Sequence, residues 1–343
     1  MSNAEVIPIG RGARTGERCK ATTSTGRPCR NYAADDSGYC RVHGGEEREL
    51  HPAGSLRGGS EERAALPESN GGRLEGFLRR RFAGDYPIDD FGLDEELLRE
   101  VMIPLLRPLY QHYFRVRSVG VERIPESGPA LLVGNHAGAI ALDAIIVQHA
   151  VATEHPANRI VRNIGEDLVF RLPFIGPLAR KCGAAVAREE DGSQLLERGE
   201  LVGVYPEGFK GVGTGWGERN RLHRFGRGGF VRLALRARAP IVPVAIVGAE
   251  RAYPIVANVK PLANMLRLPY FPVTPTFPLL GPLGALPLPS RWTLEFGEPM
   301  GFDEYPADSA RDPTLVLELA ARVRERIAGM LEANLDERRR AFL

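Results

Sequence analysis

Residues 129–143 read PALLVGNHAGAIALD, an apolar run followed by a glycine-containing loop and a second apolar stretch. The run from Pro129 to Gly134 predicts a buried strand, and Ala139 to Ala150 predicts the helix after it. Further apolar runs bounded by glycine, proline or charge occur at 183–188, 200–205 and 241–247. This alternation predicts an α/β fold with a central, mostly parallel sheet flanked by helices.

Polar residues follow two of these predicted strands, at the edge where open α/β sheets usually bind ligands. His136 follows the first strand, and Tyr205-Pro206-Glu207-Gly208 follows another. A neutral imidazole can take a proton from a hydroxyl group, and a carboxylate on its other ring nitrogen fixes the tautomer and stabilises the imidazolium. We predict that Asp143 supplies this carboxylate and that the pair serves acyl transfer to an alcohol.

The spacing of this pair constrains the backbone between them. On one unbroken helix, His136 and Asp143 would share a face but lie about 10 Å apart along the axis, too far for a hydrogen bond. A contact therefore requires residues 137–139 to form a loop that folds His136 back over the first helical turn. Gly138 permits such a path.

Four sequence blocks in this order resemble the glycerol phosphate and lysophospholipid acyltransferases, and in particular the branch that resembles monoacylglycerol acyltransferases. The blocks are Asn135-His136 with Asp143, GAAVAR at 183–188, YPEG at 205–208 and APIVPV at 239–244. Two departures stand out. Six residues separate His136 from Asp143 where the common form has four, and Phe209-Lys210 stands where many members have Thr-Arg. The resemblance runs roughly from Phe77 to the C-terminal helix, an amphipathic helix that we predict at Pro313–Asn334.

The resemblance implies direct transfer of a fatty acyl group, without a covalent enzyme intermediate. The donor would be acyl-CoA or an acyl-carrier-protein thioester, and the acceptor would be a hydroxyl of a lysophospholipid, glycerol phosphate or monoacylglycerol. His136 would act as the general base and Asp143 would orient it. No redox cofactor is implied.

The resemblance also assigns four residues to substrate binding, namely Arg188, Glu207, Gly208 and Lys210. Arg188 would bind the acceptor's phosphate or a nearby anion, and Glu207 with Gly208 would hold its polar head. Ordinary structural roles stay open: Arg188 could pair with the acids at 189–191, and Glu207 could cap a turn.

Two other classes of function stay open as well. One is a non-catalytic relative that binds lipid or acyl-CoA, which the longer interval between His136 and Asp143 would favour. The other is a thioester hydrolase that uses the same base on water. The sequence lacks a Gly-x-Ser-x-Gly nucleophile elbow, which argues against a covalent hydrolase.

Basic and acidic residues are nearly equal in number over the whole chain, but one segment is strongly basic. The 45 basic and 43 acidic residues give a net charge of +2, which says little about partners. Glu218 is the single acid among eight basic residues of one stretch: Lys210, Arg219, Arg221, Arg224, Arg227, Arg232, Arg236 and Arg238. Such a run could attract a phosphorylated acceptor, coenzyme A or an acidic carrier protein, or could be a solvated helix face. No aromatic residues alternate with the arginines, which disfavours nucleic acid.

Lipid substrates require access to a membrane surface. No run of about 18 apolar residues is present, and the N-terminus lacks the apolar core of a signal peptide. We therefore expect a cytoplasmic protein, peripheral on the inner face of the cell membrane. Residues 93–114, with Arg79–Arg81 upstream, could form an interfacial helix kinked at its prolines or could pack on the sheet. The proline-rich stretch 266–289 could line the acyl-binding tunnel or dip into lipid. Alternatively, it could be an ordered loop that packs on the core.

The N-terminal region has a different character. Its candidate metal ligands are Cys19, Cys29, Cys40 and His43, spaced C-x9-C-x10-C-x2-H, and they resemble a short module attached to many unrelated bacterial proteins. About 40 residues bury little core, so a structural zinc would supply stability, although a reduced tail without metal stays open. We expect a zinc module at 1–45, a flexible linker at 46–75 and the acyltransferase domain at 76–343.

Overall fold

The computed structural model describes residues 70–84, 86–138, 140–266 and 268–340, all within one compact unit, Pro67–Leu343. The expected zinc ligands Cys19, Cys29, Cys40 and His43 lie outside the described residues. Among the described residues, no cluster of three His, Cys, Asp or Glu side chains is placed to bind a metal. Helix α1 (Asn70–Ala83) includes residues 70–75, which the sequence analysis assigned to the linker.

A seven-stranded sheet forms the centre of the domain, in the order β1-β9-β6-β2-β5-β3-β4. The strands are β1 (Arg117–Val119), β2 (Ala130–Gly134), β3 (Val161–Gly165), β4 (Ala185–Val186), β5 (Leu201–Val204), β6 (Ile241–Val247) and β9 (Thr293–Phe296). Only the β6–β9 pairing is antiparallel; the other five pairs are parallel. The predicted mostly parallel sheet is confirmed.

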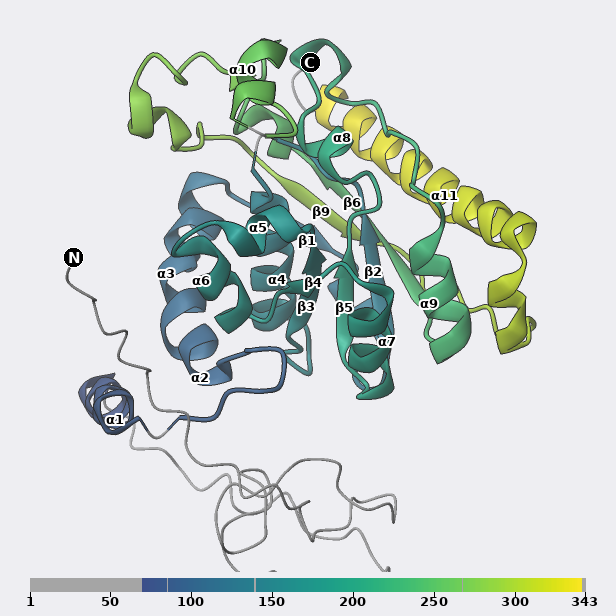
Figure 1. The fold of residues 1–343 in the computed structure, drawn as a ribbon, viewed down its shortest axis with the longest axis horizontal. Coiled ribbons are helices and arrows are strands. Elements are labelled where there is room, and N and C mark those ends of the chain that lie inside the picture. The colour runs from purple at the N-terminus through teal and green to yellow at the C-terminus, as the bar shows by residue number, and fades with distance from the viewer. Residues whose placement is uncertain (1–69, 85, 139, 267, 341–343) are drawn as a thin grey trace, which may run out of the picture. The chain divides into compact units, whose positions relative to one another are not determined.

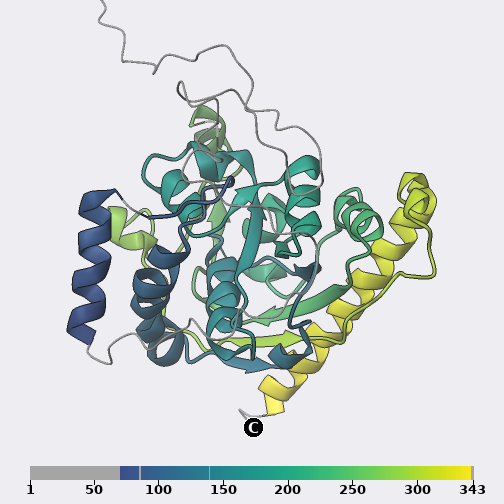
Figure 2. The same cartoon turned by 90° about the horizontal axis from the view of Figure 1, so that it is seen from below.

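Helices cover both faces of this sheet (Figures 1 and 2). The remaining helices are α2 (Glu95–Leu97), α3 (Ile103–Pro108), α4 (Leu142–Glu154), α5 (Asp167–Arg171), α6 (Ile175–Lys181), α7 (Glu189–Glu197), α8 (Phe209–Val212), α9 (Gly229–Ala237), α10 (Lys260–Met265) and α11 (Pro313–Arg340). Along β2, Leu131 and Val133 join the core formed with α7, α9 and α11, whereas Ala130 and Leu132 join the core formed with α4. Alternate residues thus serve opposite faces, which is why the strand reads as one unbroken apolar run.

The stretch from 93 to 114 packs against the domain. It follows a continuous helical path in which π-helical turns, Leu98–Met102 and Leu109–Tyr113, flank α3. Leu98, Tyr110 and Phe114 are buried, whereas Leu105 is exposed. None of the described helices combines the length and apolar character needed to cross a bilayer.

The proline-rich stretch contains little regular structure, as its prolines predict. Its strand β8 (Pro272–Val273) pairs with β7 (Ala257–Asn258), which precedes the stretch, and α10 lies between these two strands in the chain. The stretch then forms the 3-10 turn Gly281–Ala285. The strands β7 and β8 thus form an antiparallel hairpin that is separate from the seven-stranded sheet.

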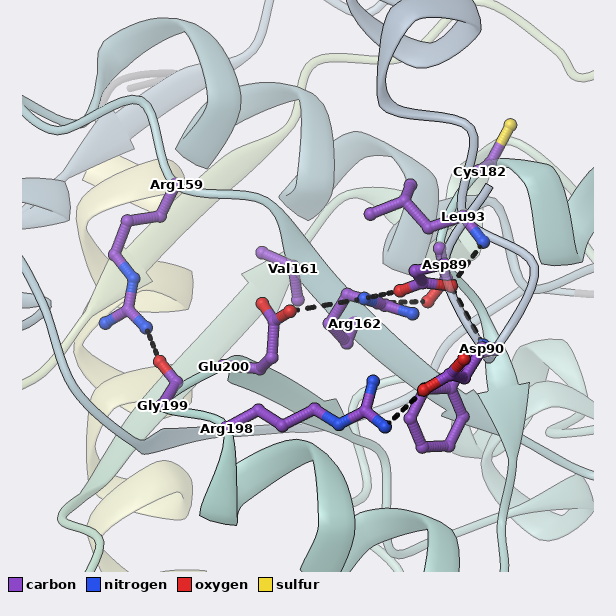
Figure 3. A network of polar contacts seen from close by, with 12 residues as sticks. Asp89, Asp90, Leu93, Arg159, Val161, Arg162, Cys182, Arg198, Gly199 and Glu200 are labelled. Carbon is purple, nitrogen blue, oxygen red and sulfur yellow. Dashed lines mark hydrogen bonds and ion pairs between the residues drawn. The ribbon is translucent and has the colours of Figure 1, made fainter. Parts of the chain in front are cut away.

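A polar network binds the segment before α2 to the amino ends of the strands (Figure 3). Arg162 on β3 is fully buried; its guanidinium donates to Asp89 Oδ2 at 2.6 Å and to the Gly183 carbonyl at 3.0 Å. Glu200, directly before β5, lies 3.4 Å from the same guanidinium. Burial raises the pKa of Asp89, but hydrogen bonds from Arg162 and from backbone N–H groups outweigh it, so the net pKa is lowered.

Asp89→Asn should remove a stabilising contribution that depends on pH. Because the folded pKa of Asp89 lies below its ordinary value, its contribution is present above pH ~4 and is lost as the pH falls through the folded pKa. We expect the substitution to lower the free energy of unfolding at neutral pH by about 1–3 kcal/mol, with a smaller loss in acid. Urea unfolding followed from neutral pH to pH ~3 measures this.

Asp90→Asn is the matched control, because Asp90 pairs with Arg198 on the exposed surface. That change should cost less than about 1 kcal/mol. Equal losses for the two variants, or a loss for Asp89→Asn that does not change with pH, would contradict the assigned role of the Arg162 network.

Candidate active site

The loop between β2 and α4 brings His136 and Asp143 together. The chain leaves β2 at Gly134 and enters α4 only at Leu142, and Gly138 takes a positive φ of 98° in between. The seven-residue interval therefore does not run along a helix, and His136 Nδ1 lies 2.7 Å from Asp143 Oδ2. A side chain at position 138 would be strained in this backbone conformation.

The Asp143 carboxylate organises the loop as well as the imidazole. It is fully buried in the first turn of α4. Oδ2 also accepts a hydrogen bond from the Ala137 N–H at 2.9 Å, and Oδ1 accepts one from the Ala144 N–H at 2.8 Å. Because an ionised carboxylate only accepts, Nδ1 of His136 carries the proton, which leaves Nε2 of the neutral ring unprotonated.

The aromatic ring of Tyr205, which follows β5, stacks on the His136 ring. The ring centroids are 4.8 Å apart and the planes are inclined by 27°. Burial, with the Asp143 charge adding to it, raises the pKa of the Tyr205 phenol well above its ordinary value, so the ring is uncharged. Tyr205 thus limits the orientations of the imidazole, a role that the sequence motif alone did not indicate.

Glu207 connects the His136 loop to a second loop. One carboxylate oxygen, Oε1, accepts from the His136 N–H at 2.9 Å, and the other, Oε2, accepts from the His223 N–H at 2.6 Å. Its side chain is buried; burial raises the pKa of the carboxyl group, and the two N–H donors oppose that rise. These contacts give Glu207 a positioning role, whereas acceptor binding by Glu207 stays a prediction.

Two further residues, to which the sequence analysis assigned no role, hold His136 in place. The buried Asn135 amide donates to the Ile246 carbonyl at 2.9 Å and accepts from the Ile246 N–H at 2.7 Å, fixing the end of β2 to β6. Gly211 in α8 packs directly on the His136 backbone. A Cβ at position 211 would lie 2.7 Å from the His136 carbonyl oxygen and 2.9 Å from its Cβ.

The other residues predicted to bind substrate are Arg188, Gly208 and Lys210. Arg188, directly before α7, has a side chain that is 62% exposed and lies 3.8 Å from Asp167. It follows β4, and β3 and β5 lie between that strand and β2. Gly208 adopts φ 55° and ψ −145°, a conformation that favours glycine. Lys210 lies in α8, but its side chain is outside the described part of the structure.

A pocket opens beside His136, between the end of β6, the loop after α8 and α11. Its lining includes Asn135, His136, Glu207, Gly211, Arg219, Arg221, Tyr253 and Leu331. Part of the basic run thus reaches the pocket. Arg232 and Arg236 instead form ion pairs with Glu189 on α7, as expected of a helix face rather than a binding site.

The sequence matches a protein family model and resembles known proteins. Residues 115–247, which span β1 to β6, match the family model described as Acyltransferase. An uncharacterized protein of Mycobacterium tuberculosis is 49% identical over 269 residues, covering 78% of this chain and 75% of that protein.

Two proteins of lower sequence identity have names that state an activity. The Bos taurus protein named DGAT1/2-independent enzyme synthesizing storage lipids is 25% identical over 170 residues, covering 47% of this chain and 48% of that protein. The crystal structure of the 1-acyl-sn-glycerophosphate (LPA) acyltransferase PlsC from Thermotoga maritima aligns with a TM-score of 0.43 at 16% identity. That alignment covers 74% of this chain and 89% of the PlsC chain.

Gly211→Ala should displace the His136 backbone, because the added methyl group would overlap two atoms of His136. We expect a changed chemical shift of the His136 imidazole in NMR spectra, with a Tm lowered by a few degrees. Gly217→Ala is the matched control, since a Cβ there meets no atom within 4 Å. Unchanged His136 signals in Gly211→Ala would show that this contact does not position the imidazole.

Proposed function

This chain belongs to the acyltransferase family and is an O-acyltransferase, and we propose that it esterifies a hydroxyl of a glycerolipid-type acceptor with a fatty acyl group. The donor would be acyl-CoA or an acyl-carrier-protein thioester, and the acceptor a lysophospholipid, a glycerol phosphate or a monoacylglycerol. The observation that carries the proposal is the 2.7 Å contact between His136 Nδ1 and Asp143 Oδ2, with the imidazole lining a pocket.

The proposed reaction uses His136 as a general base. Nε2 takes the proton of the acceptor hydroxyl while the hydroxyl oxygen attacks the thioester carbonyl carbon. The carbon–sulfur bond then breaks, and the leaving thiolate takes the proton back from the imidazolium. Asp143 stabilises the imidazolium through its hydrogen bond to Nδ1–H.

The surroundings of the imidazole support this role for His136. Its side chain is only 10% exposed, so it has few orientations to lose when substrate binds. Asp143 holds the ring by Nδ1, Tyr205 covers one ring face, and Glu207 and Gly211 fix the backbone. A base held this way lowers the entropic cost of reaching the reactive geometry.

For the acceptor's charged group we propose Arg188 as a binding residue, with Glu207, Gly208 and Lys210 near the polar head. Arg188 is exposed and pairs at 3.8 Å with Asp167, which is exposed too, so a phosphate could replace that weak pair at little cost. A guanidinium also matches phosphate geometry better than other cations do.

We also propose two features of the protein beyond this domain's chemistry. One is a separate N-terminal module at 1–45, in which Cys19, Cys29, Cys40 and His43 hold a structural zinc and which a linker joins to helix α1 at Asn70. Its support is the sequence spacing. The other is a peripheral location on the inner face of the cell membrane, supported by the lipid character of the proposed substrates.

His136→Ala should lower the rate of acyl transfer by about 10²–10⁴-fold because it removes the general base, while the variant still folds and unfolds cooperatively. Asp143→Asn should also slow transfer, through loss of the charge that stabilises the imidazolium. Product mass spectrometry with one acyl thioester and a panel of lipid alcohols measures both variants. Retained turnover in His136→Ala would remove the proposed base, and free thiol release without an acceptor would indicate hydrolysis instead.

Arg188→Ala should raise the KM for a phosphorylated acceptor with little change in kcat, and should leave the KM for monoacylglycerol unchanged. Arg171→Ala is the matched control, because Arg171 is 77% exposed and pairs with the same Asp167 at 3.6 Å. Steady-state kinetics with both acceptors checks this. An unchanged KM for the phosphorylated acceptor in Arg188→Ala would reject phosphate binding.

A further inference from the structure

We propose that the hairpin at residues 256–289 is the surface by which the domain docks onto an anionic lipid bilayer. The proposal rests on the proposed function insofar as a lipid acceptor must be taken from a membrane. It adds to that function a specific docking surface, which we call the 256–289 hairpin.

The hairpin exposes large apolar side chains that it does not pack against the domain. The most exposed are Leu279 (84%), Met265 (71%), Leu283 (67%), Leu286 (62%) and Val256 (61%). Single exposed leucines are common on protein surfaces, but several in one short segment mark an interaction surface. Transfer of these side chains from water into the acyl boundary of a bilayer would be favourable.

The charge of the same stretch indicates which surface it meets. From Arg251 to Leu294 the sequence contains no Asp or Glu, but it contains Arg251, Lys260, Arg267 and Arg291. The chain as a whole is nearly neutral, at +2, so the absence of acids is local to this stretch. Arg251 pairs with Glu250, but within residues 256–289 the sequence has Lys260 and Arg267 and no acid. Apolar side chains together with such cations complement the boundary between anionic headgroups and acyl chains.

The hairpin is also attached to the candidate active site. The Tyr253 hydroxyl donates to the Ala285 carbonyl at 2.9 Å, and Tyr253 lines the pocket beside His136. At the other side, a Cβ on Gly213, directly after α8, would lie 3.2 Å from the Tyr270 ring. Figure 1 shows α10 and α8 at the same end of the domain. A bilayer against the hairpin would therefore lie close to the pocket.

Other occupants fit these observations less well. Among the described residues that line the pocket beside His136, none of Leu279, Leu283 and Leu286 is present, so these side chains do not form the wall of an acyl tunnel there. A second copy of the chain would bring the same cations against each other if the hairpins met symmetrically. An anionic bilayer satisfies both the apolar and the cationic side chains.

Co-sedimentation of the full-length chain with phosphatidylcholine vesicles, with and without phosphatidylglycerol, tests the proposal. Leu279→Ser combined with Leu283→Ser should weaken binding to both kinds of vesicle by about tenfold or more, because two leucines are lost from the interface. Lys260→Glu should weaken binding only to vesicles that contain phosphatidylglycerol. Leu105→Ser combined with Leu317→Ser is the matched control, with exposed leucines on α3 and α11.

Unchanged vesicle binding in the Leu279 and Leu283 variant would overturn the proposal, and so would a loss of binding confined to the control variant. If the Leu279 and Leu283 variant lost self-association but still bound vesicles, the hairpin would be a contact with a second copy of the chain, and the proposal would be overturned. Turnover of a water-soluble thioester and alcohol should persist in the hairpin variants. Absent turnover in the unmodified chain would refute the proposed function while leaving the vesicle result to be judged by itself.

Discussion

The arrangement of the site depends on a buried carboxylate that must be compensated. Asp143 is fully buried, and an isolated charge in that position would be strongly unfavourable. Its compensation comes from the Ala137 and Ala144 N–H groups and from the His136 ring. The loop therefore takes the path that brings these donors to the carboxylate, and the orientation of the imidazole follows from the same requirement.

A second buried carboxylate extends this constraint across the sheet. Glu207 follows β5 and accepts from the His136 N–H, so it joins the ends of β2 and β5, which are neighbours in the sheet. Asn135 joins β2 to β6 in the same way through Ile246. The position of His136 is thus fixed from both neighbouring strands. This explains why the candidate base lies on a loop without being free to move as loops usually are.

The sequence predicted the central parts of the fold because its buried parallel strands are uninterrupted apolar runs. It missed β3, where Arg162 and Asn163 interrupt the apolar pattern, because the partners that make a buried arginine acceptable, such as Asp89, lie far away in the chain. It also began the helix after β2 too early, at Ala139 rather than Leu142, because an apolar loop and an apolar helix start look alike. The roles of Glu207 and Gly211 could not be predicted, since both depend on contacts with His136 across the fold.

The charged groups at the two ends of the strands have different kinds of partner. At the amino ends, Arg162 satisfies Asp89 and lies within reach of Glu200, so the charges there are engaged in holding the domain together. At the carboxyl ends, the carboxylates of Asp143 and Glu207 are satisfied largely by backbone N–H groups. The imidazole is held there through Nδ1, and Nε2 is the atom that the proposed reaction uses. The ion pairs that hold the sheet and the proposed base thus lie at opposite ends of the strands, so a substrate at the proposed site would not need to break those ion pairs.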